Sequence, residues 1–246
     1  VSIEVNDSKV VISGAITFDL VSFQASGIGL DYNSIEQAAA RGVVVEAVDE
    51  SGNTLVSTVT DNQGLYSMRV AANTSTRVRI SAKLLQTSGV TWDVKVTDNT
   101  ASDALYAVQG DIFNTGTADS TRSFNMPSGW DGTSYSGDRS AAPFAVLDAI
   151  YDTMQKFAAA DSSLEFPALE VHWSENNNPA SGDLPSGDIG TSFYSSGKIY
   201  LLGDADTDTD EYDRHVLIHE WGHYFENKLS RSDSVGGSHS LVERLD

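Results

Sequence analysis

The 246-residue sequence contains no cysteine. Disulfide bonds, thiolate zinc sites and cysteine nucleophiles are therefore excluded. The sequence also lacks an apolar run of the roughly 20 residues that a membrane-spanning helix needs. It has no phosphate-binding glycine loop and no nucleophile elbow, so its motifs give no support to nucleotide chemistry or serine hydrolysis.

Basic residues are scarce. The sequence has 15 Lys and Arg against 35 Asp and Glu, a formal net charge of −20, and residues 101–246 hold 24 of the acidic side chains. A charge of this sign repels nucleic acid and anionic membranes, so we expect neither as a partner. We interpret the excess of acidic side chains as a well-solvated protein surface, suited to an extracellular or cell-surface location. The sequence begins at Val1, within a polar segment that has the residue pattern of a strand. We therefore expect that an export signal or lipid anchor has been removed.

Residues 1–98 consist of short apolar, β-branched runs separated by turn-forming residues. This pattern predicts an antiparallel β-sandwich, with a short helix near Ser34–Ala40 as its only helical segment. The predicted strands are Val10–Ile16, Gly42–Val48, Thr54–Thr60, Leu65–Val70, Thr76–Leu84 and Thr91–Thr97. The strand Gly42–Val48, followed by the Thr-Asp-x-x-Gly-x-Tyr pattern within Thr58–Tyr66, resembles the carboxypeptidase regulatory-like (prealbumin-like) sandwich. That resemblance implies an accessory module without chemistry of its own.

The pattern changes after residue 98. We expect residues 99–246 to form a second domain of the α+β class, and the whole chain to be a multi-domain protein. A Gly/Ser/Asp-rich stretch, Asn114–Arg139, predicts an irregular segment. Apolar residues at three-and-four spacing predict a helix over Ala141–Ala160. The remaining predictions are a strand at Ala168–Trp173, a loop at Asn176–Gly190, strands at Thr191–Tyr194 and Lys198–Leu202, and a helix at Glu211–Leu229 capped by Asp210.

The last helix contains His219-Glu220-Trp221-Gly222-His223, an H-E-x-x-H motif. Residues four apart lie one above the other on a helix, so both imidazoles can reach one metal ion. Glu220 points to the neighbouring edge, where it can act as the general base on a metal-bound water. We therefore predict one Zn²⁺ held by His219 and His223, with Glu220 as the catalytic residue. A pair of ordinary helical histidines with a solvent-facing glutamate is the alternative interpretation.

The order helix, strands, helix with H-E-x-x-H on the second helix resembles the N-terminal catalytic subdomain of the zincin metallopeptidases. The metzincin subclass is excluded because Glu226 and Leu229 occupy the positions of its glycine and histidine. The segment resembles secreted bacterial metallopeptidases of the gluzincin type, and this resemblance implies Glu243 as the third zinc ligand. His239 remains an alternative. A residue beyond Asp246 is another, because zincin catalytic domains carry a C-terminal subdomain that we expect to be missing here. The resemblance further implies that a strand within Thr191–Leu202 holds the substrate backbone.

The function that follows is zinc-dependent hydrolysis of a peptide or protein substrate. Candidates for a donor to the transition-state oxyanion are Tyr224, His239 and Arg244. The alternative is a non-catalytic surface binding or adhesion protein that keeps a degenerate zincin module.

Alternating carboxylates precede the helix at Asp204, Asp206, Asp208 and Asp210. They suggest a Ca²⁺ loop, although the segment lacks the glycine and the glutamate that an EF-hand loop has at its sixth and twelfth positions. A solvated acidic turn is the competing interpretation.

Overall fold

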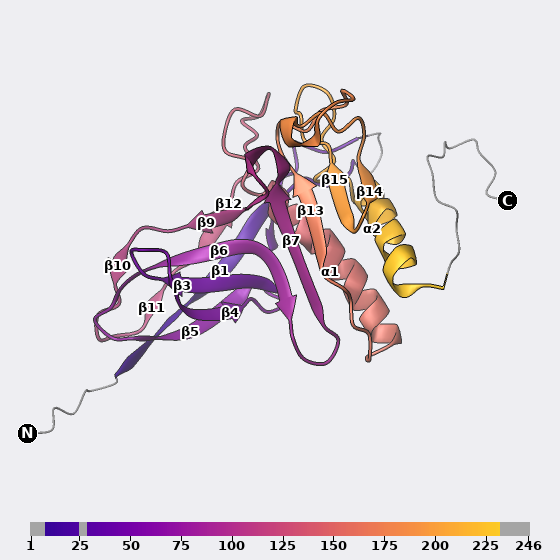
Figure 1. The fold of residues 1–246 in the computed structure, drawn as a ribbon. Coiled ribbons are helices and arrows are strands. Elements are labelled where there is room, and N and C mark those ends of the chain that lie inside the picture. The colour runs from indigo at the N-terminus through magenta and orange to yellow at the C-terminus, as the bar shows by residue number, and fades with distance from the viewer. Residues whose placement is uncertain (1–7, 25–28, 232–246) are drawn as a thin grey trace, which may run out of the picture.

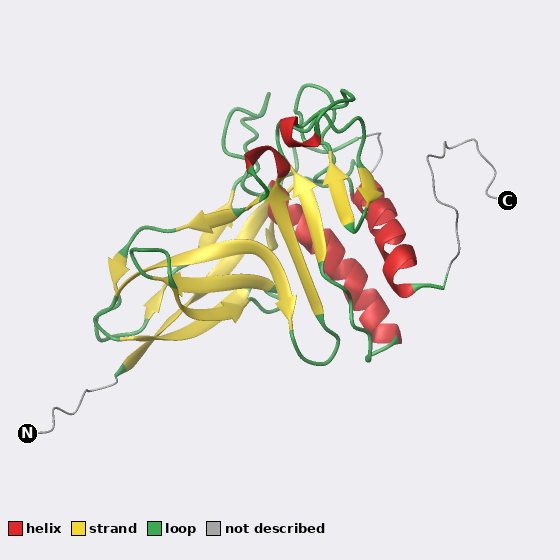
Figure 2. Cartoon of the chain, viewed as in Figure 1, coloured by secondary structure: helices red, strands yellow, loops and turns green. Residues whose placement is uncertain are grey.

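The computed structural model describes residues 8–24 and 29–231 of the chain. This part of the protein is mostly β-sheet, with two α-helices (Figures 1 and 2). The helices are α1 (Ala142–Ala160) and α2 (Arg214–Leu229), and two 3-10 turns are η1 (Asn99–Ala101) and η2 (Leu184–Ser186). The strands are β1 (Lys9–Leu20), β2 (Glu36–Ala39), β3 (Val43–Val48), β4 (Thr54–Val59), β5 (Leu65–Ala71), β6 (Ser75–Gln86), β7 (Trp92–Asp98), β8 (Ala104–Leu105), β9 (Ala107–Gln109), β10 (Phe113–Asn114), β11 (Ser120–Thr121), β12 (Phe124–Met126), β13 (Leu169–Trp173), β14 (Phe193–Ser195) and β15 (Lys198–Leu201).

Strand β1 is the centre of the smaller sheet. One edge pairs antiparallel with β5 and then β2, and the other pairs parallel with β11 and β12. Ile12, Ile16 and Phe18 alternate along β1 and are fully buried, as expected for a strand with one face on the core. Gly14 interrupts this row because a Cβ at this position would clash with the carbonyl oxygen of Arg122.

The larger sheet has the order β14-β15-β13-β7-β6-β3-β4, with β8, β9 and β10 as short additions. Its β7–β13 and β13–β15 pairs are parallel, whereas β14 runs antiparallel to β15 at the end of the sheet. Both sheets contain strands from each side of the expected boundary between residues 98 and 99. The two expected domains therefore share their sheets.

Helix α1 packs against β6, β7 and α2 and fills the space behind the parallel strands (Figure 1). Its residues Phe144, Leu147, Ile150 and Met154 are essentially fully buried, which confirms the helix expected over Ala141–Ala160. Burying a side chain of this size contributes about 1.5–3 kcal/mol relative to leaving it exposed. The helix begins without a side-chain cap, and proline lies in its first turn.

Helix α2 begins later than the sequence suggests. It starts at Arg214, and its N-cap is Asp213, whose carboxylate accepts from the backbone N–H groups of His215 and Val216. The prediction that Asp210 caps the helix is wrong, because Asp210 is buried one turn earlier and bonds to Ser192.

Two other sequence predictions are corrected by the described structure. The segment Ser34–Ala40 contains no helix; residues 36–39 form β2, because pairing with β1 satisfies its backbone groups. The stretch Asn114–Arg139 is not wholly irregular, since β11 and β12 lie within it and pair with β1. None of the helices described is long and apolar enough to cross a membrane.

Candidate active site

Helix α2 brings His219 and His223 together. Their Nε2 atoms lie 3.2 Å apart, and their rings are almost perpendicular, with centroids separated by 4.8 Å. His219 is exposed and His223 is half-buried, so the pair faces the surface of the molecule. Glu226, one turn after His223, places a carboxylate oxygen 3.9 Å from the Nδ1 atom of His223.

This geometry fits two ligands of a zinc ion. Imidazole nitrogens bind zinc at about 2.0–2.1 Å, and two such ligands at a tetrahedral angle stand about 3.3 Å apart. The observed separation of 3.2 Å matches that spacing. A hydrogen bond between the two rings gives a similar separation.

Glu220 lies between the two histidines in sequence, but its side chain is buried whereas theirs reach the surface. Its side chain is buried, with 8% exposure, whereas that of His219 is exposed. The position is suitable for a proton-transfer role next to the two imidazoles.

The opposite side of α2 is anchored in the core. Leu217, Trp221 and Tyr224 are fully buried, and the Trp221 ring stacks against Phe225 and lies close to Phe157 of α1. This packing fixes the rotation of the helix and therefore the direction in which His219 and His223 point.

Strand β14 runs beside α2 at the end of the larger sheet (Figure 1). The Tyr194 hydroxyl donates to the side-chain oxygen of Asn227 at 3.0 Å, which ties the strand to the helix. Within the described part of the chain, the outer edge of β14 pairs with no other strand. Its backbone groups there can bind an extended peptide.

Tyr224, one of the expected transition-state donors, is held in the core. Its hydroxyl donates to the Pro167 carbonyl at 2.5 Å, and burial raises the pKa of this phenol above its ordinary value. This contact favours a structural role. The other expected residues, Glu243, His239 and Arg244, lie outside the described residues.

Among residues 8–24 and 29–231, no three His, Asp or Glu side chains lie close enough together to hold a metal ion. Of the four expected calcium-loop residues, Asp206 and Asp208 are exposed, Asp204 is half-buried, and Asp210 is buried against Ser192.

A buried ion pair stands directly before α2. Arg139 donates to the Glu211 carboxylate at 2.5 Å and also to the carbonyl oxygen of Gly203. The indole N–H of Trp173 donates to the other Glu211 oxygen at 3.3 Å. The sequence analysis did not find this cluster, because its members are distant in sequence and belong to no motif.

Comparison with known proteins adds little to this picture. No family model matches the chain, and no curated protein is detectably similar to it. A solved structure from Pseudomonas aeruginosa, of a protein proposed to bind carbohydrate, has 12% identity and a TM-score of 0.28, over 49% of this chain and 90% of that one. The major plantain pollen allergen Pla l 1 has 14% identity and a TM-score of 0.24, over 48% and 94% of the two chains. Likenesses this weak carry no argument about this protein.

Proposed function

We propose that this protein is a zinc-dependent metallopeptidase in which His219 and His223 bind the metal and Glu220 is the general base. The observation that carries the proposal is the joint placement on α2 of two Nε2 atoms 3.2 Å apart and of the buried carboxylate Glu220, one residue after His219. The adjacent edge strand β14 supports it. The zincin-like catalytic subdomain and the third ligand, with Glu243 as first candidate, belong to this proposal.

Zinc at such a site would lower the pKa of a water molecule to about 7 and polarise a carbonyl group. Glu220 then takes a proton from the attacking water and passes it to the leaving amine. Strand β14 holds the substrate backbone through its open edge, which places the peptide bond beside α2.

The test measures zinc content and proteolysis of the full chain. We expect one zinc per chain after dialysis against a weak chelator, and loss of that zinc in His219→Ala and His223→Ala. His215→Ala is the matched control, because His215 lies one turn earlier on the same helix and contacts the Phe23 ring. It should keep the zinc.

Glu220→Gln separates binding from catalysis. It should keep the zinc but cleave a fluorescent denatured protein substrate about 10²–10⁴ times more slowly. Failure of the unaltered chain to bind zinc tightly would overturn the proposal. Tight zinc binding without cleavage of a broad peptide library would favour the alternative of a surface binding protein.

A further inference from the structure

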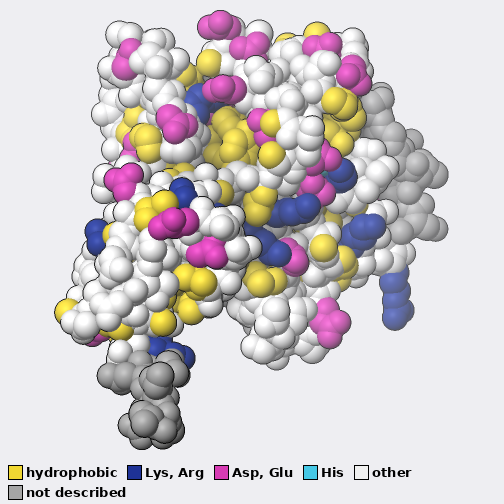
Figure 3. Space-filling view, turned by 60° about the vertical axis from the view of Figure 1, so that its left-hand side comes forward, with side chains coloured by type: hydrophobic (Ala, Val, Ile, Leu, Met, Phe, Trp, Pro, Cys, Tyr) yellow, Lys and Arg dark blue, Asp and Glu magenta, His cyan; other side chains and the backbone are white. Residues whose placement is uncertain are grey.

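A cavity of about 410 Å³ lies where the carboxyl ends of β7 and β13 meet the N-terminus of α1. Its lining comes from Asp98 and from parts of residues 106–109, 138–144 and 173–176. No residue of α2 lines it, so it is distinct from the candidate zinc site. Figure 3 shows a hollow in the upper half of the molecule with hydrophobic side chains inside it and acidic side chains around it.

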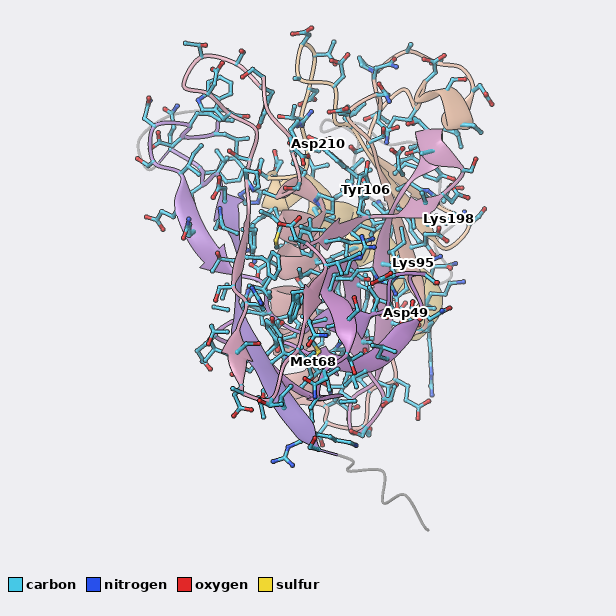
Figure 4. All side chains as sticks on the ribbon, turned by 90° about the vertical axis from the view of Figure 1, so that its left-hand side faces the viewer. Asp49, Met68, Lys95, Tyr106, Lys198 and Asp210 are labelled. Carbon is cyan, nitrogen blue, oxygen red and sulfur yellow. The ribbon has the colours of Figure 1, made fainter. Side chains whose placement is uncertain are left out.

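Part of the cavity wall is aromatic and apolar, and the remaining lining residues are polar or charged. The rings of Tyr106 and Trp173 lie 5.6 Å apart, and the buried residues Pro143 and Phe144 also line the cavity. The Tyr106 hydroxyl donates to the Trp173 carbonyl oxygen at 3.2 Å, which fixes the ring in place. Tyr106 is labelled in Figure 4. Rigid rings of this kind bind the flat or aliphatic part of a ligand at little entropic cost.

The charge at the cavity is negative. Three carboxylates line it, from Asp98, Asp138 and Glu175. The single basic residue of the lining is Arg139, which is 6% exposed and neutralised by its ion pair with Glu211. Burial raises the pKa of Tyr106, and the negative charges of Asp98 and Glu175 raise it further.

Arg139 also leaves one hydrogen-bond donor unused. Its Nε–H group is buried and has no partner among the described residues.

We propose that this cavity binds an arginine or lysine side chain of a peptide ligand. The cationic head lies between the carboxylates of Asp138 and Glu175, and the aliphatic stem lies against the rings of Tyr106 and Trp173. An anionic ligand is disfavoured, because it would meet three carboxylates without an unpaired cation. The proposal does not depend on the peptidase function.

The test measures binding of N-acetyl-arginine amide to the full chain by calorimetry and by NMR. Its comparators are the N-acetyl amides of norleucine and of glutamate, which have similar stems without the cation. We expect the arginine compound to bind most tightly and to weaken as NaCl rises from 0.05 to 0.5 M (roughly a Debye length of 14 Å falling to 4 Å).

Substitutions then locate the site. The double variant Asp138→Asn/Glu175→Gln should weaken arginine binding by about fivefold. This corresponds to about 1 kcal/mol in total for the two exposed charge pairs. Glu36→Gln is the matched control, because Glu36 is an exposed carboxylate on β2 that does not line the cavity. Ala107→Trp, at an exposed position of the lining, should abolish binding by filling the opening.

Three results would each overturn the proposal. One is equal binding of the arginine and norleucine compounds, and another is arginine binding that the double variant leaves unchanged. The third is tighter binding of the glutamate compound, or of a neutral sugar such as glucose, than of the arginine compound.

Discussion

Asp210 should make the protein less stable as pH rises. The residue is 5% exposed, and the Ser192 hydroxyl donates to its carboxyl group at 2.5 Å. Burial raises the pKa of Asp210 to about 6 from 3.8, and the negative charges of Asp208, Asp213 and Glu211 add to the shift. The Ser192 hydrogen bond opposes it but is too weak to cancel the loss of hydration.

The sign and size of the effect follow from linkage. Between pH 3.8 and 6 the folded protein retains a proton on Asp210 that the unfolded chain releases, so the free energy of unfolding falls as pH rises. The difference between the folded and unfolded pKa values of Asp210, roughly 2.2, corresponds to a loss of about 3 kcal/mol in the free energy of unfolding. This loss is complete above pH 6. Asn has nearly the same shape, can still accept the Ser192 hydrogen bond and carries no charge. Asp210→Asn should therefore stabilise the protein by about 3 kcal/mol at pH 7.5 and by almost nothing below pH 4.

Urea unfolding of both proteins at several pH values between 3.5 and 8 measures this. The difference between the two curves isolates Asp210, because all other titrating groups are shared. Asp206→Asn serves as the control for removing one carboxylate, since Asp206 is exposed in the same segment. If the Asp210→Asn difference does not change with pH, the folded protein accommodates the Asp210 charge and the reasoning from burial is refuted.

Three further predictions concern stability and can be checked by urea or thermal unfolding. Asp213→Ala removes the N-cap of α2 and should reduce the free energy of unfolding by about 1 kcal/mol; an unchanged value would show that the cap is not needed. Arg139→Met leaves the buried Glu211 carboxylate without its cation and should cost about 3–5 kcal/mol, and Glu211→Gln made in the same background should recover part of that loss. Gly64→Ala should cost more than about 1 kcal/mol, because Gly64 has φ +74° and a Cβ there collides with the carbonyl oxygen of Ile16; a neutral result would mean that the turn can rearrange.

Local patterns predicted the elements that carry the candidate site. The apolar spacing of Ala141–Ala160 matches α1, and strands were found at Ala168–Trp173 and Lys198–Leu202 within about one residue of their ends. The H-E-x-x-H spacing placed His219 and His223 on one helical face, which the 3.2 Å contact confirms. These features depend on residues close in sequence, where helix and strand periodicity act directly.

Features that depend on distant residues were missed. The sequence analysis predicted Asp210 as the cap of α2. Asp210 is instead buried against Ser192, a residue distant in sequence, and Asp213 caps the helix. Residues 34–40 have the composition of a helix, but pairing with β1 overrides that preference. The acidic cavity is built from four separate segments, so no single stretch of sequence contains its pattern.

The pairing of β1 sets the earliest moment at which the smaller sheet can be completed during synthesis. Ile12 pairs with Ser120 and Phe18 with Met126, a separation of 108 positions. Until those residues leave the ribosome, one edge of β1 stays open to other strands, including those of neighbouring chains. Pairings of such high contact order form slowly, so the nascent chain should depend on chaperones during this interval. A fragment that ends at residue 98 would remain in that state permanently.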